Sequence, residues 1–332
     1  MTSSNPYLSI VLTGRNDEYG VDFRSRFFHT LQFNHRELSE RGISHEFVFV
    51  EWAPEPRRAL LVDLVAETIP VLDERCFTGY VVDERYHEAL SLNPRLEYLE
   101  FLAKNVGIRR ARGTFILASN CDVFFSRRIL QRFQDGDLEP RTVYRAARHD
   151  LKLSVDHSCL DWEGLEDGDN LETPPAILKP PLMGGGTGDF VLLDRETFRH
   201  LGGFNEVYRV ARIGIDQNFL VKALSGGIPI ADIGGPVYHV NHAGSYRLSR
   251  NLHAGREVEA PYGNVCWHSH GVVYDNPPGW GLQRAPVRRR NEHSSLLEFS
   301  WNAVPPHVDL RRIVLPVART GFPYPGRYVE RW

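Results

Sequence analysis

Short apolar runs alternate with amphipathic stretches over the first third of the chain. The runs are rich in β-branched and aromatic residues, as buried strands are. They cover residues 8–13, 45–50, 78–82 and 114–118. Between them, Phe23, Phe27 and Leu31 recur at helical spacing, as do Leu102 and Val106. Strands separated by helices predict an α/β fold with a mostly parallel central sheet flanked by helices.

The second half of the chain alternates less regularly. Strands are predicted at residues 190–193 and 228–233, and helices at residues 194–201 and 214–224. Residues 150–181 are acidic and contain prolines, which is typical of a long loop or an insertion. From residue 245 onward, Pro, Gly, Arg and aromatic residues dominate without periodicity. We therefore expect an irregular C-terminal extension that wraps the body or covers a site as a lid.

Composition narrows the class of protein. Of 332 residues, 42% are hydrophobic and 24% are charged, which fits a soluble globular chain that can bury a core. The net charge of −3 argues against a nucleic-acid binder. The four cysteines lack zinc-ribbon or redox spacing, so we expect free thiols in a cytoplasmic, reducing compartment. No apolar run reaches the roughly 18 residues of a transmembrane segment, and residues 1–6 lack a signal-peptide pattern.

Polar side chains follow three of the predicted strands at the point where each strand ends. They occur in residues 13–17, 51–54 and 119–122. The carboxyl ends of parallel strands form the usual ligand edge of an open α/β sheet. Turn or helix-cap roles are the alternative for any one of these residues. No dinucleotide-binding or P-loop glycine motif stands where it should, which argues against those enzyme classes.

The stretch 103–122 carries the clearest motif. Lys104 and Asn105 lie in a helical segment that ends at Gly113, and a strand then leads to Asn120 and Asp122. This order resembles the core of family 2 glycosyltransferases with the Rossmann-like A-type fold. In that family a basic residue and Asn precede a glycine, a strand and an Asp-x-Asp signature. Asn120 stands where the signature has its first acid.

Further segments follow in the order of that family. Residues 9–17 resemble its first nucleotide-binding strand, and Glu51 stands where the family has an acid after its second strand. Residues 188–195 and 201–204 resemble its acceptor-side strand, helix and Gly-Gly-Phe turn.

The remaining motifs complete the resemblance over residues 8–247. Asp216 and Gln217 resemble the catalytic acidic motif, and residues 238–242 resemble the terminal histidine strand. The resemblance implies a nucleotide-sugar-binding subdomain at residues 1–125, an acceptor-binding and catalytic subdomain at 126–247, and the extension at 248–332.

The resemblance implies a nucleotide diphosphate sugar as the donor. Its pyrophosphate charge must be neutralised, and a divalent cation with oxygen ligands does this. Asp122, His239 and His242 are the expected ligands of Mn²⁺ or Mg²⁺. The residues expected to bind the donor are Thr13, Arg15, Asn16, Asp17, Glu51, Lys104, Asn120, Asp122 and Gly188.

The implied reaction is transfer of a sugar, hexosyltransferase-like, to a hydroxyl group of a glycan or small-molecule acceptor. Inversion by direct displacement is favoured, with Asp216 as the general base. Asp189 is its rival for that role, or a residue that holds the acceptor. Because Asp216 begins a predicted helix, its pKa is expected to stay low. A helix cap is the alternative role for Asp216.

Other functions stay open at this stage. They are a retaining transferase on the same fold, a non-catalytic binder of nucleotides or carbohydrates, and a metal-dependent hydrolase using histidines of the tail. Asn120 favours the second, whereas the third lacks a His-Glu-x-x-His motif. Residues 184–188 can bring backbone close to a ligand, 268–270 fit a lid, and 288–290 fit a solvated charge run. A homo-oligomer is compatible with all of these interpretations.

Overall fold

The computed structural model describes residues 5–172, 178–184, 187–209, 214–242, 272–306 and 328–330. The main sheet contains the strands β1 (Leu8–Gly14), β2 (His45–Trp52), β3 (Phe77–Val82), β4 (Phe115–Ser119), β5 (Val123–Phe125), β6 (Val143–Asp150), β7 (Phe190–Asp194), β8 (Ile230–His239), β10 (Val287–Arg289) and β11 (Ser294–Leu297). A second sheet pairs β9 (Val272–Tyr274) with β12 (Tyr328–Glu330).

The α-helices that the structure describes alternate with these strands along the chain. They are α1 (Phe23–Glu40), α2 (Leu61–Thr68), α3 (Glu84–Leu90), α4 (Glu100–Arg110), α5 (Arg127–Asp135), α6 (Trp162–Glu166), α7 (Arg195–His200) and α8 (Ile215–Ser225). Local signals explain some ends. Ser126 caps α5 by accepting from the Ile129 N–H, and Gly136 ends it with a φ of 66°. Asp194 caps α7 in the same way through the Thr197 N–H.

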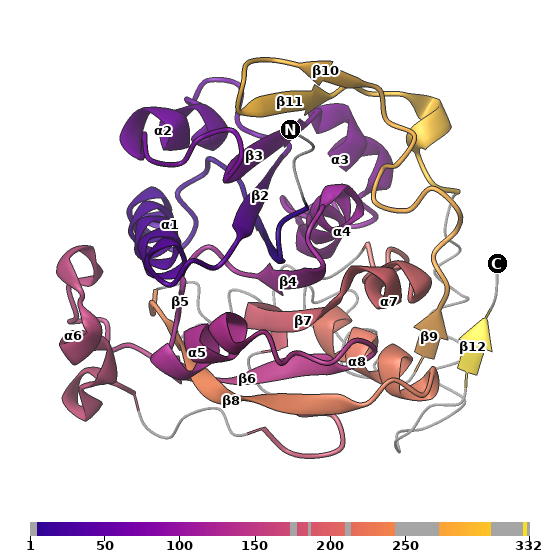
Figure 1. The fold of residues 1–332 in the computed structure, drawn as a ribbon. Coiled ribbons are helices and arrows are strands. Elements are labelled where there is room, and N and C mark those ends of the chain that lie inside the picture. The colour runs from indigo at the N-terminus through magenta and orange to yellow at the C-terminus, as the bar shows by residue number, and fades with distance from the viewer. Residues whose placement is uncertain are drawn as a thin grey trace.

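The main sheet has the order β10-β11-β3-β2-β1-β4-β7-β6-β8-β5 (Figure 1). β3, β2, β1 and β4 are parallel neighbours, as are β11 with β3 and β6 with β8. The other four pairings are antiparallel. The predicted α/β class with a mostly parallel central sheet is therefore confirmed. The sheet takes strands from all three predicted segments, and the subdomain boundaries stay a prediction.

The two faces of the sheet bury separate apolar clusters. On β2, Phe47 and Phe49 pack with α1 on one face, and Phe49 lies 4.6 Å from the Phe27 ring. Val50 packs with Val106 of α4 on the other face. This follows from the period-two alternation of a strand. Each fully buried side chain of this size contributes about 1.5–3 kcal/mol, so the helices are fixed where they flank the ligand edge.

Within its described residues, the C-terminal extension is mostly irregular, as predicted, but contains short strands. β11 adds to the main sheet beside β3, and β10 forms the outer strand of a hairpin with it (Figure 1). The three arginines at 288–290 form ion pairs with Glu298, Glu74 and Asp63, as a solvated charge run does. The lid candidate at residues 268–270 lies outside the described residues. No described helix combines the length and the apolar character needed to cross a bilayer.

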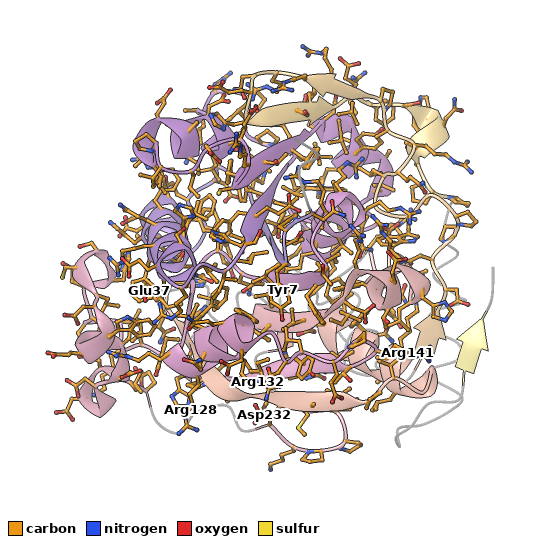
Figure 2. All side chains as sticks on the ribbon, in the orientation of Figure 1. Tyr7, Glu37, Arg128, Arg132, Arg141 and Asp232 are labelled. Atoms are coloured by element: carbon orange, nitrogen blue, oxygen red, sulfur yellow. The ribbon has the colours of Figure 1, made fainter. Side chains whose placement is uncertain are left out.

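The acidic stretch predicted as a loop contains α6, which docks on α1. Trp162 of α6 donates from Nε1 to Glu37 Oε2 at 3.1 Å, and its ring meets Phe33 at 5.1 Å. Figure 2 shows Glu37 on the side of α1 that faces α6. The guanidinium groups of Arg41 and Arg127 lie over the Trp162 ring at 5.8 and 4.9 Å. These contacts fix the insertion although its sequence is mostly polar.

Candidate functional site

The predicted site residues lie around the carboxyl ends of β1, β2 and β4. These strands are parallel and in register, so their ends at Gly14, Trp52 and Ser119 face the same edge of the sheet. The chain leaves β4, passes Asp122 and enters β5, which pairs antiparallel with β8. This pairing sets Val123 opposite His239 and brings the histidine stretch to the ligand edge.

Asp122, His239 and His242 form the candidate cation site. One ligand atom from each residue lies within 4.8 Å of the others, and all three side chains are buried. Asp122 Oδ1 is 3.7 Å from His239 Nε2, and Asp122 Oδ2 is 3.3 Å from His242 Nε2. The Val240 N–H donates to the Asp122 carbonyl at 2.9 Å and fixes the two segments together. The structure thus brings together the three residues predicted as metal ligands.

The charge state of this group suits ligation. Burial alone would raise the pKa of Asp122, but His239, His242 and the Arg26 charge together lower it well below its usual range. For His242, by contrast, burial lowers the pKa of the imidazole. Near neutral pH the carboxylate is therefore ionised and the His242 imidazole is neutral, which are the forms that bind metal ions.

The donor set fits a divalent transition-metal ion. One carboxylate and two imidazoles converge, and imidazole nitrogen suits transition metals, whereas Mg²⁺ prefers oxygen ligands throughout.

A second group of predicted residues surrounds Gly188. Lys104 Nζ donates to Asn120 Oδ1 at 2.8 Å and to the Gly188 carbonyl at 2.9 Å, and it pairs with Glu100 at 2.9 Å. Asn120 Nδ2 donates to Asp189 Oδ1 at 2.7 Å. Lys104 and Asp189 are buried. Asn120, which replaces the first acid of the signature, therefore connects the Lys104 ammonium group to the Asp189 carboxylate.

Arg148 links this second group to the cation site, and sequence reasoning missed it. Its Nη1 donates to Asp189 Oδ2 at 3.0 Å, and its Nη2 donates to Asp150 Oδ1 at 2.5 Å. The same Nη2 lies 2.9 Å from His239 Nδ1. Arg148 and Asp150 belong to β6, for which no strand was predicted, so their placement beside His239 became visible only with the sheet.

Asp216 lies next to the second group at the start of α8. A Cβ atom on Gly188 would stand 3.8 Å from both Asp216 Oδ2 and Asn120 Nδ2. Gly214 precedes α8 with a φ of 87°, a left-handed conformation that glycine adopts easily. The expectation that the pKa of Asp216 stays low is wrong. Burial raises this pKa, and the Gln217 N–H, Arg145 and Lys104 offset the effect only in part.

The predicted residues after β1 form a third group together with the segment after β2. Arg15 pairs with Asp17 at 3.0 Å and Glu55 at 2.8 Å, and it donates to the Ala53 carbonyl. Asn16 accepts from the Glu55 N–H at 2.7 Å and is buried. Thr13 lies near the end of β1, and its carbonyl accepts from the thiol of Cys121, which follows β4.

Glu51 has a structural role in this conformation. It is buried, and its two carboxylate oxygens accept from the Leu61 and Val62 N–H groups at 2.9 and 3.1 Å. It thereby caps α2, which is the alternative that the sequence left open for such residues. Burial raises the pKa of Glu51 to about 7, although the two N–H groups oppose this.

Arg26 is a second residue of the site that sequence reasoning missed. It lies on the apolar face of α1, is buried, and its Nε is 3.8 Å from Asp122 Oδ2. Its terminal nitrogens donate to the carbonyls of Tyr19 and Val21. A Cβ on Gly20 would come within 2.3 Å of His242 Nδ1. Arg26 therefore holds the turn after β1 against the cation site, and a charged residue inside an apolar helical face was the available signal.

Comparisons with known proteins concern the fold. No known family profile matches the chain, and no curated protein matches it in sequence. The chain is similar in structure to GalNAc-T7 crystallised with UDP, GalNAc and Mn²⁺, at 14% identity and a TM-score of 0.46. The match covers 80% of this chain and 51% of that one, so this chain spans about half the length of GalNAc-T7.

Two other solved structures are similar at comparable levels. One is the catalytic domain of Drosophila β1,4-galactosyltransferase 7 with xylobiose, at 10% identity and a TM-score of 0.38, over 90% of this chain and 96% of that chain. The other is S. aureus TarS 1–349, at 13% identity and a TM-score of 0.42, over 79% and 69% respectively. At such identities and TM-scores, a function for this chain rests on the residues of its own site.

Proposed function

We propose that the protein is a glycosyltransferase that moves a sugar from a nucleoside diphosphate sugar to a hydroxyl acceptor. The observation that carries this proposal is the buried group of Asp122, His239 and His242 at the ligand edge of the sheet. Two further carboxylates, Asp189 and Asp216, are connected to it or lie close by. This combination suits a substrate that has a diphosphate beside a reacting carbon.

The three clustered residues would hold the cation. Such an ion supplies Lewis-acid stabilisation to a departing diphosphate. The ionised Asp122 and the neutral imidazole of His242 present lone pairs to it, as the pKa directions above require. Arg26 holds the turn after β1 beside the same group.

The nucleoside end of the donor is proposed to lie by the third group. The side chain of Asp17 is 22% exposed, more than that of Arg15 at 15%, while Asn16 is buried against residues 55–59. Asp17 is therefore the proposed acceptor of hydrogen bonds from the base or ribose. Arg15 and Asn16 hold the loop that presents it.

Asp216 is the proposed general base. A general base needs a carboxylate oxygen within hydrogen-bond reach of the acceptor proton. Both oxygens of Asp189 are engaged, by Asn120 and by the cationic Arg148. Burial raises the pKa of Asp216 towards the operating pH, which makes its carboxylate a better proton acceptor. Asp189 is then the proposed residue that orients the acceptor.

The test combines binding and turnover. Nucleoside diphosphates are screened by thermal shift with and without Mn²⁺, because a ligand that binds the folded state raises its apparent stability. A panel of nucleotide sugars is then tested for release of the nucleoside diphosphate. We expect Mn²⁺-dependent binding and turnover with at least one donor. Asp122→Ala should abolish both, while Asp135→Ala on the exposed end of α5 should not.

The outcomes separate the alternatives. Mn²⁺-dependent binding without turnover across donors and acceptors would favour a non-catalytic nucleotide or carbohydrate binder. Neither binding nor turnover would contradict the proposal. Where a product forms, NMR of its anomeric configuration decides between inversion, which the assignment of Asp216 as base requires, and retention.

A further inference from the structure

Two side chains contact one ring nitrogen of His239. Its Nδ1 lies 3.0 Å from Asp150 Oδ1 and 2.9 Å from Arg148 Nη2. Asp150 is directly opposite His239 where β6 pairs with β8, and Arg148 lies two residues away on the same face of β6. Asp150 and His239 are both buried, with 4% and 3% of their side chains exposed. The contact is therefore fixed by the sheet and shielded from solvent.

The partner of Nδ1 decides what the other ring nitrogen can do. A neutral imidazole carries one proton. If Nδ1 accepts a hydrogen bond from Arg148, the proton must be on Nε2, which then faces Asp122 as a donor and has no lone pair for a metal ion. If Nδ1 carries the proton and donates to Asp150, the lone pair of Nε2 faces Asp122 and the candidate cation site.

We propose that Asp150 is a positioning residue that holds His239 with its proton on Nδ1, so that Nε2 can bind the cation. Histidine ligands commonly donate their second N–H to a carboxylate in this way, which fixes the ring and strengthens the ligand. Arg148 opposes this arrangement as a competing donor to Nδ1, although its hydrogen bonds to Asp150 also hold that carboxylate in place. The inference rests on the cation site of the proposed function.

The arrangement makes a continuous path between two parts of the site. Asp122, His239, Asp150, Arg148 and Asp189 contact one another in this order, at 3.7, 3.0, 2.5 and 3.0 Å. When Asp150 accepts from His239, Arg148 keeps its bonds to both carboxylates. Arg148 therefore contacts both the carboxylate proposed to position His239 and the carboxylate proposed to orient the acceptor.

The experiment measures Mn²⁺ binding to the full chain without substrate. Free Mn²⁺ is titrated by electron paramagnetic resonance, and the pulsed spectrum of the bound ion reports directly coordinated ¹⁴N nuclei. We expect two coordinated imidazoles in the parent and a loss of about 10–100-fold in affinity for Asp150→Asn, with only one imidazole remaining. Asp150→Glu, which keeps the charge, should recover part of the affinity and the second nitrogen signal.

Glu46→Gln is the matched control, because Glu46 is a buried carboxylate bonded to Arg112 and Ser9 at the opposite end of the strands. It should cost stability and leave both Mn²⁺ affinity and the two nitrogen signals unchanged. If Asp150→Asn fails to fold, ¹⁵N NMR of the parent with Zn²⁺ decides, and a protonated Nδ1 on His239 is expected.

Two results would overturn the inference, and they are distinct. Parent-like affinity and two coordinated nitrogens in Asp150→Asn, or an unprotonated Nδ1 in the Zn²⁺-loaded parent, would reject the role of Asp150 and leave the cation site intact. No Mn²⁺ binding by the parent would reject the cation site of the proposed function, and this inference with it.

Discussion

Replacing Glu51 with Gln should make the protein more stable above neutral pH. The carboxyl of Glu51 is buried, and its oxygens accept from the first N–H groups of α2. A glutamine has nearly the same shape and keeps one acceptor oxygen for these N–H groups. It removes the charge that burial disfavours, so the cap survives while the desolvation cost disappears.

The size of the effect follows from the pKa. Burial raises the pKa of Glu51 from 4.5 to about 7, so between these values the folded state binds the proton more tightly than the unfolded state does. The free energy of unfolding of the parent therefore falls as pH rises through this range and is constant above it. With about 1.4 kcal/mol per pKa unit, the difference amounts to about 3 kcal/mol.

Urea unfolding of both proteins at pH 4.5, 6 and 8 measures this directly, because other titrating groups cancel in the difference. We expect similar stabilities at pH 4.5 and a variant that has gained about 3 kcal/mol relative to the parent by pH 8. A stability difference that does not change with pH would refute the reasoning. If Glu51→Gln instead weakens binding of nucleoside diphosphates tenfold, then Glu51 contacts the donor as the sequence suggested.

Three further predictions concern other parts of the molecule. Asp216→Asn should bind nucleoside diphosphate as the parent does and lose transfer by about two to four orders of magnitude; if Asp189→Asn alone has this effect, their roles are exchanged. EDTA should abolish transfer and Mn²⁺ restore it, and His242→Ala should require more Mn²⁺ for half-maximal activity; full activity in EDTA would exclude a role for the cation. Burial lowers the pKa of His45 from 6.5 to about 4, so the free energy of unfolding should fall by about 3 kcal/mol as pH drops through this range. Urea unfolding of His45→Gln should show no such fall at acid pH. An equal fall in the variant would contradict the assignment to His45.

The parallel part of the fold was predictable because its strands are buried on both faces. The predicted run at residues 8–13 corresponds to β1 at Leu8–Gly14, and that at 114–118 to β4 at Phe115–Ser119. Strands in such positions must be almost continuously apolar, and this pattern is visible without any partner.

β6 and the C-terminal hairpin could not be predicted, because neither has a continuous apolar run. β6 reads Val-Tyr-Arg-Ala-Ala-Arg-His-Asp, and its Arg148 contacts Asp189 of β7 and His239 of β8, which are far from it in the sequence. β11 is four residues long and takes its stability from pairing with β3. In both cases tertiary contacts decide the structure, and a local pattern contains no record of them.

The same distinction applies to the candidate site. Asp122 and the histidines were predictable because each follows or ends a strand at the ligand edge, and the motif order is itself a sequence feature. Arg148 and Asp150 have no such marker, yet they connect His239 to Asp189 through contacts of 2.5 to 3.0 Å. A lone buried Asp beside a buried Arg would serve only to balance charge. Here the Asp150 carboxylate also contacts Nδ1 of His239, a proposed metal ligand, and Arg148 contacts Asp189, which is proposed to orient the acceptor. The residues that the sequence does not reveal are therefore those that would make the separate parts of the site act together.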